Sequence, residues 1–184
     1  DLGRYRARVL CLLGYLVTPW IAPLGDGRSR LLEAHEAARA AGDVTFMSYT
    51  SNHLVTLALG TGDALDELEA QIVLGREQAQ KAQFGLVTDF FTGQLRLVRA
   101  LRGCAPVFVA PTGSEETELD FEARMLGDPL RAIAACWYWI RKLQAQYHEG
   151  ALDQAEASAE RAGALLWTST ADFELAEYHF FAAL

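Results

Sequence analysis

The ends of the expected helices recur along this chain at nearly even intervals, and this feature constrains the fold more than any other. Stretches of helix-forming residues with few β-branched runs end near Thr18, Gly60, Gly103 and Gly150. The intervals between these ends are 42, 43 and 47 residues, close to the repeat lengths of stacked helix pairs. The pattern predicts an all-α fold, an α-solenoid of about four antiparallel helix pairs. An irregular helical bundle is the alternative interpretation.

Gly, Pro and short polar segments separate the expected helices. The helices are expected at residues 4–18, 28–41, 44–59, 63–81, 86–102, 117–126, 129–148, 151–166 and 170–184. The first should stop at Pro19, because proline has no amide hydrogen to donate inside a helix. Residues 19–27 and 103–114 are expected to form loops longer than a helical hairpin needs. With no linker between the helices, we expect one helical-repeat domain over residues 1–184.

The clearest single helix is the one expected at residues 63–81. Leu65, Leu68, Ile72 and Ala79 fall on one stripe of this helix, and charged residues take its other sides. The spacing therefore predicts an amphipathic helix that buries this stripe against its neighbours.

Two of the expected hairpins align without gaps. Each has an aromatic residue eleven positions before a turn glycine, and apolar or small residues five and twelve positions after it. The aromatic residue fills the space between two helices, glycine permits the chain reversal, and small residues allow close packing. The aligned residues are Tyr49, Gly60, Leu65 and Ile72 in one hairpin, and Trp139, Gly150, Ala155 and Ala162 in the other.

The second hairpin, WIRKLQAQYHEGALDQAEASAERA at residues 139–162, resembles a tetratricopeptide repeat. It matches that family at the large early residue, the turn glycine and the two later alanines. It departs from the family at Leu143, where a small residue is preferred, and it lacks the usual closing proline. The resemblance implies a tetratricopeptide-like α-solenoid, in which the first helices of the pairs line a concave groove.

Three stretches together resemble the helical-repeat region of large bacterial multidomain signalling proteins. They are LLEAHEAARAAGD at residues 31–43, the spaced residues Tyr49, Leu54 and Gly60, and LLWTSTADFELAEYHFFAAL at residues 165–184. Those proteins join a serine/threonine kinase-like module and a STAND-type predicted ATPase to a downstream sensor and histidine kinase. The resemblance implies that this chain is a fragment of a larger chain, and that any ATPase or kinase activity lies outside it.

The composition argues against several classes of partner. Sixteen basic residues against 24 acidic ones give a net charge of −8, which disfavours nucleic-acid binding because phosphates need a basic face. The uncharged run at residues 9–25 is interrupted by Pro19 and is short for a membrane span, so no membrane association is expected. The three cysteines are odd in number and lack metal-ligand spacing, which is typical of a reduced, cytoplasmic chain.

No motif in the chain indicates a catalytic centre. The glycine segments at residues 60–63 and 111–115 lack the lysine that would hold a phosphate. The four histidines are scattered, and the acidic run at residues 115–122 is expected to be a solvated helix start. Cys136 lies in an apolar run and is expected to be a buried, unreactive thiol. We therefore expect no enzyme activity, no cofactor and no metal, although a helical enzyme with a dispersed site that includes His53 or His148 is a disfavoured alternative.

The unusual aromatic concentration lies at residues 137–139. Successive residues on a helix point about 100° apart, so these three aromatic side chains cannot all enter one core contact. The resemblance implies groove-side candidates on the same helix, and the alternative is core packing for both tryptophans. The candidate partner-binding residues are Trp137, Ile140, Gln144, Tyr147 and His148.

These observations favour a non-catalytic scaffold that mediates contacts between proteins or between modules of a signalling ATPase or kinase. A free-standing adaptor is one alternative. Another is a small-molecule sensor with an apolar pocket between repeats, lined by the Trp/Tyr cluster and the loop Val107-Phe108-Val109. The alanine-rich stripes and the apolar last helix also permit a homodimer through open helical ends.

Overall fold

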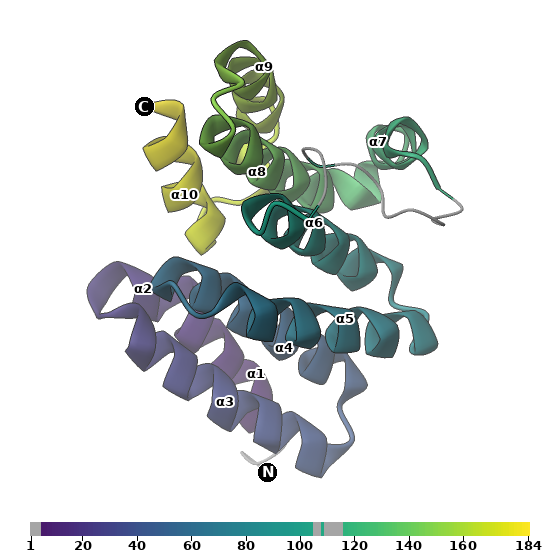
Figure 1. Ribbon diagram of the computed structural model, residues 1–184. Coiled ribbons are helices and arrows are strands. Elements are labelled where there is room, and N and C mark those ends of the chain that lie inside the picture. The colour runs from purple at the N-terminus through teal and green to yellow at the C-terminus, as the bar shows by residue number, and fades with distance from the viewer. Residues whose placement is uncertain (1–4, 105–107, 109–115) are drawn as a thin grey trace. The chain divides into compact units, whose positions relative to one another are not determined.

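The computed structural model describes residues 5–104, 108 and 116–184, which form the all-helical chain of Figure 1. The predicted all-α fold is confirmed for these residues, and consecutive helices pack as antiparallel pairs. The α-helices are α1 (Arg6–Leu12), α2 (Thr18–Ile21), α3 (Leu24–Ala41), α4 (Val44–Thr61), α5 (Leu65–Lys81), α6 (Gly85–Leu101), α7 (Glu118–Leu126), α8 (Ala132–His148), α9 (Leu152–Gly163) and α10 (Phe173–Ala182). A π-helix covers Leu13–Val17, and 3₁₀ helices cover Pro129–Arg131 and Leu166–Thr168.

The chain divides into two compact units. The first unit comprises Asp1–Phe91 and Ala171–Phe173, and the second comprises Thr92–Thr170 and Glu174–Leu184. In the first unit α3 packs against α1 and α4, and in the second α8 packs against α7 and α9. The single domain expected over residues 1–184 stays a prediction.

Two expected boundaries near the start of the chain are wrong. The helix does not stop at Pro19, because a π-helix at Leu13–Val17 interrupts the regular ladder and a new turn, α2, begins at Thr18. Pro19 then lies in the first turn of α2, where its missing amide hydrogen has no intrahelical partner to lose. The hydroxyl of Thr18 donates a hydrogen bond to the carbonyl of Leu13 at 2.6 Å, which ties the two turns together.

The loop expected at residues 19–27 is also mostly helix, because α3 begins at Leu24. Its Gly27 meets Gly14 of the π-helix backbone to backbone. A Cβ atom on Gly27 would lie 2.6 Å from the carbonyl oxygen of Gly14, closer than side chains approach. Gly27, which was expected at the end of a loop, therefore lies in a helix and permits close helix packing.

The turn glycines are partly as predicted. Gly103 and Gly150 have left-handed backbone angles, with φ of +66° and +75°, and each follows a helix as expected. Gly60 does not close its helix, since α4 continues to Thr61 and Gly62 takes the left-handed position with φ +78°. The repeat spacing read from the sequence therefore holds at the later helix pair and is shifted by two residues at the earlier one.

The stripe predicted for residues 63–81 is confirmed in α5. Leu68, Ile72 and Ala79 are fully buried, and Leu65 is half-buried at the start of the helix. Gly75 lies on the same side, and a Cβ on it would meet the ring of Phe91 at 2.5 Å. This stripe forms part of the core of the first unit.

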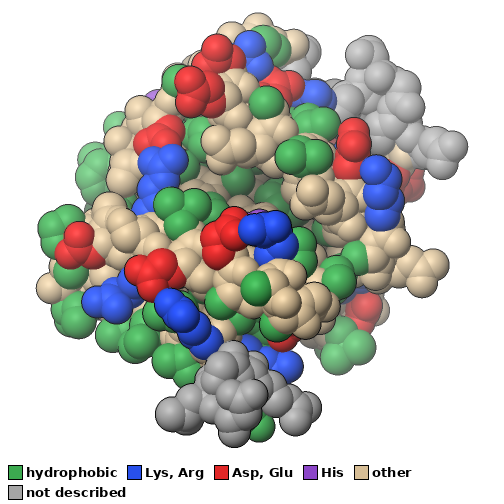
Figure 2. Space-filling view, turned by 90° about the horizontal axis from the view of Figure 1, so that it is seen from below, with side chains coloured by type: hydrophobic (Ala, Val, Ile, Leu, Met, Phe, Trp, Pro, Cys, Tyr) green, Lys and Arg blue, Asp and Glu red, His purple; other side chains and the backbone are tan. Residues whose placement is uncertain are grey.

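Surface charges on the view in Figure 2 are mixed, with acidic and basic side chains beside one another and hydrophobic side chains between them. Within the first unit, Arg28 pairs with Asp63 at 2.6 Å and Arg39 pairs with Glu36 at 2.6 Å. The Arg28–Asp63 pair is partly buried, whereas the Arg39–Glu36 pair is exposed, and an exposed pair contributes little to stability. Both pairs intersperse the two signs of charge on the surface.

Candidate functional site

Helix α8 organises the second unit. Nearly every side chain from Ala134 to Gln146 is buried, with Lys142 half-buried. A helix that is buried on all sides must satisfy its polar groups internally. Two sides of α8 do so in different ways: one faces α10 and the other faces α7 and α9.

The side of α8 that faces α10 carries the predicted groove residues. The indole nitrogen of Trp137 donates a hydrogen bond to the hydroxyl of Ser169 at 2.9 Å, and Ile140 is fully buried. The side-chain amide of Gln144 donates to Glu177 of α10 at 3.1 Å. These three residues are covered in the structure and present no open groove surface. A role of Trp137, Ile140 or Gln144 in partner binding stays a prediction.

Tyr147 and His148 lie at the end of α8, where the surface begins. Tyr147 is half-buried and His148 is exposed, and the ring centroid of each lies 5.6 Å from that of Phe181 on α10. The structure thus brings these two candidates together with an aromatic residue from the last helix. Partner binding at this position stays a prediction.

A buried ion cluster holds α10 against α8. The guanidinium of Arg141, whose side chain is 2% exposed, donates to Glu177 at 2.6 Å and to Glu174 at 3.2 Å. It also donates to the side-chain oxygen of Gln144 at 3.1 Å. Sequence reasoning missed this cluster, because its members lie on helices separated by more than 30 residues and carry no local spacing signal. Its buried, paired charges indicate a structural role.

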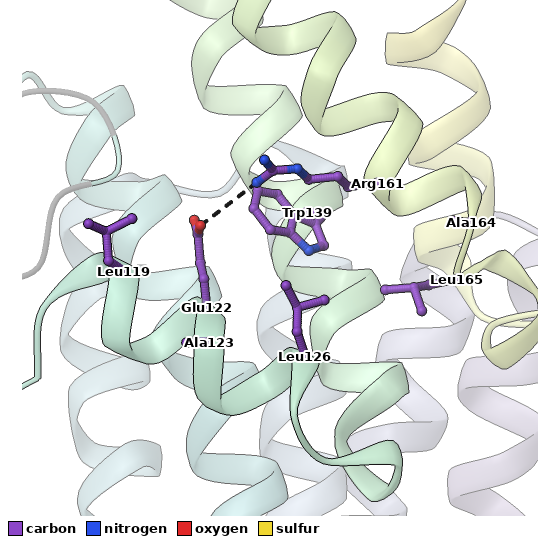
Figure 3. A pocket seen from close by; sticks show the side chains of 8 residues that line it. All are labelled: Leu119, Glu122, Ala123, Leu126, Trp139, Arg161, Ala164 and Leu165. Carbon is purple, nitrogen blue, oxygen red and sulfur yellow. Dashed lines mark ion pairs between the residues drawn. The ribbon is translucent and has the colours of Figure 1, made fainter.

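On the opposite side of α8, Trp139 lines an open pocket of about 490 Å³ (Figure 3). This volume is within the range of small-molecule sites in proteins. The walls are mostly apolar and come from α7, α8, the end of α9 and the residues that follow it. The lining residues are Leu119, Glu122, Ala123, Leu126, Trp139, Arg161, Ala164 and Leu165.

Charged groups lie against the Trp139 ring beside the pocket. The guanidinium of Arg161 lies 4.5 Å from a ring centroid of Trp139 and 3.8 Å from a carboxylate oxygen of Glu122. The ammonium of Lys142 bonds to both Glu118 and Glu122 and lies 5.0 Å from the Trp139 ring. Two acidic and two basic groups therefore form ion pairs here, and both cations make cation–π contacts with the indole.

Behind this layer, Tyr138 donates a hydrogen bond from its hydroxyl to Glu122 at 2.8 Å and accepts one from Arg96 at 3.1 Å. Burial raises the pKa of Tyr138 well above its usual value, with Glu122 adding to the shift and Arg96 opposing it. The phenol therefore stays neutral and serves as a fixed hydrogen-bond donor that orients Glu122.

Trp139 itself has an unsatisfied polar atom. Its side chain is 1% exposed, and its ring nitrogen has no hydrogen-bond partner among the described residues. Figure 3 shows this nitrogen on the side of the ring toward Leu126 and Leu165, away from the guanidinium of Arg161. A buried indole N–H usually has a hydrogen-bond acceptor. The apolar part of the pocket therefore lacks an acceptor for the Trp139 N–H among the described residues.

The acidic run behaves differently from the solvated helix start that was expected. Thr117 caps α7 by accepting a hydrogen bond from the amide of Asp120, as a helix start should. Glu122, however, is buried and bonded, and Glu118 bonds to Lys142. The expectation of solvation is therefore wrong for Glu122, because α7 folds against the basic residues of α8. Glu115 lies outside the described residues.

The sensor hypothesis placed a pocket beside the Trp/Tyr cluster and residues 107–109. Trp139 does line a pocket, whereas Phe108 is buried with its ring centroid 5.1 Å from that of Tyr138 and is not a lining residue. Val107 and Val109 lie outside the described residues. The walls from α7 and α9 could not be recognised in the sequence, because leucines and alanines at helical spacing are equally typical of a core.

Within the described residues, no group of three or more His, Cys, Asp or Glu side chains is placed to hold a metal ion. None of the three cysteines forms a disulfide bond within the described residues. Cys11 and Cys136 are buried, as expected for Cys136, whose thiol lies 3.9 Å from the carbonyl oxygen of Ala162, and Cys104 is exposed. In that same part of the chain, none of the helices combines the length and the apolar character needed to cross a bilayer.

His53, the other histidine considered for chemistry, is buried in the first unit. Its ring stacks on that of Tyr15 with centroids 3.4 Å apart. Burial lowers the pKa of His53 to about 3. The neutral ring is therefore part of the core at neutral pH, and it has no charge to use in binding.

This shift makes the first unit sensitive to acid. Between pH 6.5 and 3 the unfolded chain binds a proton at His53 that the folded chain does not, so stability falls as the pH falls. At pH 5 the expected loss from this one group is about 2 kcal/mol relative to pH 7. The measurement is urea unfolding of the wild type and of His53→Gln at both pH values. The loss of unfolding free energy between pH 7 and pH 5 should be absent in His53→Gln and should persist in His148→Gln. An equal loss in all three proteins would contradict this prediction.

Comparisons of the chain with known protein families, with curated proteins and with solved structures find no match. The resemblance to helical-repeat proteins therefore rests on residues 31–43, 139–162 and 165–184 and on the spacing of Tyr49, Leu54 and Gly60.

Proposed function

We propose that this chain is a non-catalytic, tetratricopeptide-like helical-repeat scaffold that binds proteins or adjacent modules of a bacterial signalling ATPase or kinase. The antiparallel helix pairs support the proposal, because α8 and α9 form the hairpin that resembles a tetratricopeptide repeat. The clustered charges of the second unit are engaged with one another, which suits a binding module better than acid–base chemistry.

The observation that carries the proposal is an aromatic surface at the ends of α8 and α10. We call it the end surface, and it comprises Tyr147, His148, Phe180 and Phe181. Phe180 is 60% exposed and lies beside Phe181, which contacts Tyr147 and His148. Helical repeats bury the apolar side of each repeat against the next, so this surface suits a neighbouring helical module or a second copy of the chain.

Self-association tests the end surface directly. We expect the isolated chain to form dimers in sedimentation velocity experiments, because an exposed phenylalanine in an apolar surface is a strong contact. Phe180→Glu should weaken this association by about tenfold or more, since it places a charge in the contact. The control is Leu74→Glu, at an exposed leucine of α5 in the first unit, which should leave it unchanged.

A chain that stays monomeric at every concentration, with Phe180→Glu behaving identically, would contradict self-association through the end surface. The parent reading frame tests the signalling context. An ATPase module upstream and a sensor or kinase downstream support an intramolecular scaffold. A frame with neither points to a free-standing adaptor.

The pocket beside Trp139 favours a second candidate function, a small-molecule sensor. The volume of about 490 Å³, the apolar lining and the unsatisfied indole nitrogen are the features of a ligand site. The two functions are compatible, because the pocket and the end surface use different residues of the second unit.

A further inference from the structure

We propose that the pocket beside Trp139 binds an uncharged apolar small molecule that carries a carbonyl oxygen, and that the indole N–H of Trp139 donates a hydrogen bond to that oxygen. This inference rests on the sensor function and names the class of its ligand. It is independent of the end surface.

The indole N–H of Trp139 is a hydrogen-bond donor that a ligand could satisfy. The ring nitrogen of Trp139 is buried without a partner among the described residues. Leaving a buried donor unsatisfied costs about 1–3 kcal/mol, and an acceptor supplied by a ligand would recover part of that cost. Trp139 is a donor only, so the complementary group on the ligand has to be an acceptor.

The surroundings of the nitrogen decide the charge of the ligand. Figure 3 shows that the nitrogen faces Leu126 and Leu165, whereas the guanidinium of Arg161 lies at the other end of the ring. A carboxylate placed between the two leucines would lose its hydration and gain a single neutral donor. The charged groups around the pocket already pair with one another, Lys142 with Glu118 and Glu122, and Arg161 with Glu122. An uncharged carbonyl therefore fits this place better than an anion.

We expect Leu126 to control access to the indole nitrogen, because Figure 3 shows this side chain beside the indole. Its side chain is 63% exposed at the end of α7 and lines the pocket. Exposed side chains change rotamer within nanoseconds, so Leu126 can turn aside without disturbing the core. A larger side chain at position 126 should block the access of a ligand to the Trp139 nitrogen. The same change at an exposed leucine outside the pocket should leave that access unchanged.

The test uses two probes of the same shape. Acetophenone carries a carbonyl group where α-methylstyrene carries a carbon–carbon double bond, and benzoate supplies an anionic comparison. Binding is followed through the indole N–H signals in ¹H–¹⁵N NMR spectra, with the Trp139 signal assigned from its loss in Trp139→Phe. We expect saturable binding of acetophenone with a downfield shift of the Trp139 proton, and about tenfold weaker binding of α-methylstyrene.

Variants locate the site. Leu126→Phe should weaken acetophenone binding several-fold, whereas Leu130→Phe, at an 85% exposed leucine that does not line the pocket, should bind as the wild type does. Both positions are exposed, so both variants should fold.

The outcomes separate the ligand class from the sensor function. Equal binding of acetophenone and α-methylstyrene in the pocket would overturn the carbonyl assignment and retain an apolar ligand site. Tighter binding of benzoate would overturn the uncharged class. If none of the three probes perturbs Trp139 saturably, both the inference and the sensor function fail.

Discussion

Replacing Arg141 with methionine is expected to destabilise the folded chain by about 3–5 kcal/mol. The arginine is almost fully buried, and its guanidinium bonds to Glu174, Glu177 and Gln144. Methionine has a similar length and no charge. The variant therefore leaves two carboxylates in the interior of the second unit without their cation, and an uncompensated buried charge costs more than the lost pair contributed.

Two controls distinguish buried charge from lost packing. The triple variant Arg141→Met/Glu174→Gln/Glu177→Gln removes the stranded charges together with the cation, so it should recover a large part of the loss. Arg39→Met breaks an ion pair with Glu36 that is exposed on both sides, and it should cause no measurable change. Urea unfolding followed by circular dichroism measures the unfolding free energies of the wild type and of the three variants. A triple variant no more stable than Arg141→Met would contradict the charge argument.

The second large effect is expected at Gly27. Gly27→Ala should destabilise the chain by about 3 kcal/mol, because the new Cβ would lie 2.6 Å from the carbonyl oxygen of Gly14. Both contacting atoms are held by helical backbone, so relief requires the π-helix and α3 to move apart. That movement would also loosen Leu57, which lies 3.2 Å from the same Cβ position.

Gly25 offers a matched control in the same helix, since a Cβ there would meet nothing within 4 Å. Gly25→Ala should leave stability unchanged or raise it by up to about 1 kcal/mol, because alanine favours a helix over glycine. The two alanine variants therefore have opposite expected signs. Thermal unfolding of both decides the matter, and a Gly27→Ala protein as stable as Gly25→Ala would show that the helices do not pack this closely.

The second unit combines a structural and a candidate binding role in one helix. On one side of α8, Arg141 is fully engaged with the acidic residues of α10. On the other side, the indole N–H of Trp139 has no acceptor among the described residues, and the ring borders an open pocket. A rigid helix that positions a donor beside an apolar cavity is a suitable basis for ligand recognition, because the helix is held in place by the buried charges behind it.

Much of the helical structure could be predicted from local patterns. The stripe of Leu68, Ile72 and Ala79 indicated α5 because a helix repeats every 3.6 residues, and those residues are buried. Gly103 and Gly150 marked chain reversals correctly, since the left-handed conformation that they adopt is strained for other residues. Local rules failed where tertiary contacts changed the role of a residue. Pro19 lies in the first turn of α2, directly after the π-helix, and Gly27 lies in the packed helix α3 rather than in a loop.

The sequence by itself determined that the chain is all-helical, because periodicity, capping residues and turn glycines are properties of neighbouring residues. It also drew attention to residues 137–139, although not to which of these aromatic residues borders open space. That was decided by the tertiary structure. Trp137 donates a hydrogen bond to Ser169, whereas Trp139 lines the pocket and its nitrogen has no partner in the described part of the chain. The partners of both residues come from other helices, and which helices meet α8 depends on packing between distant segments rather than on any local pattern.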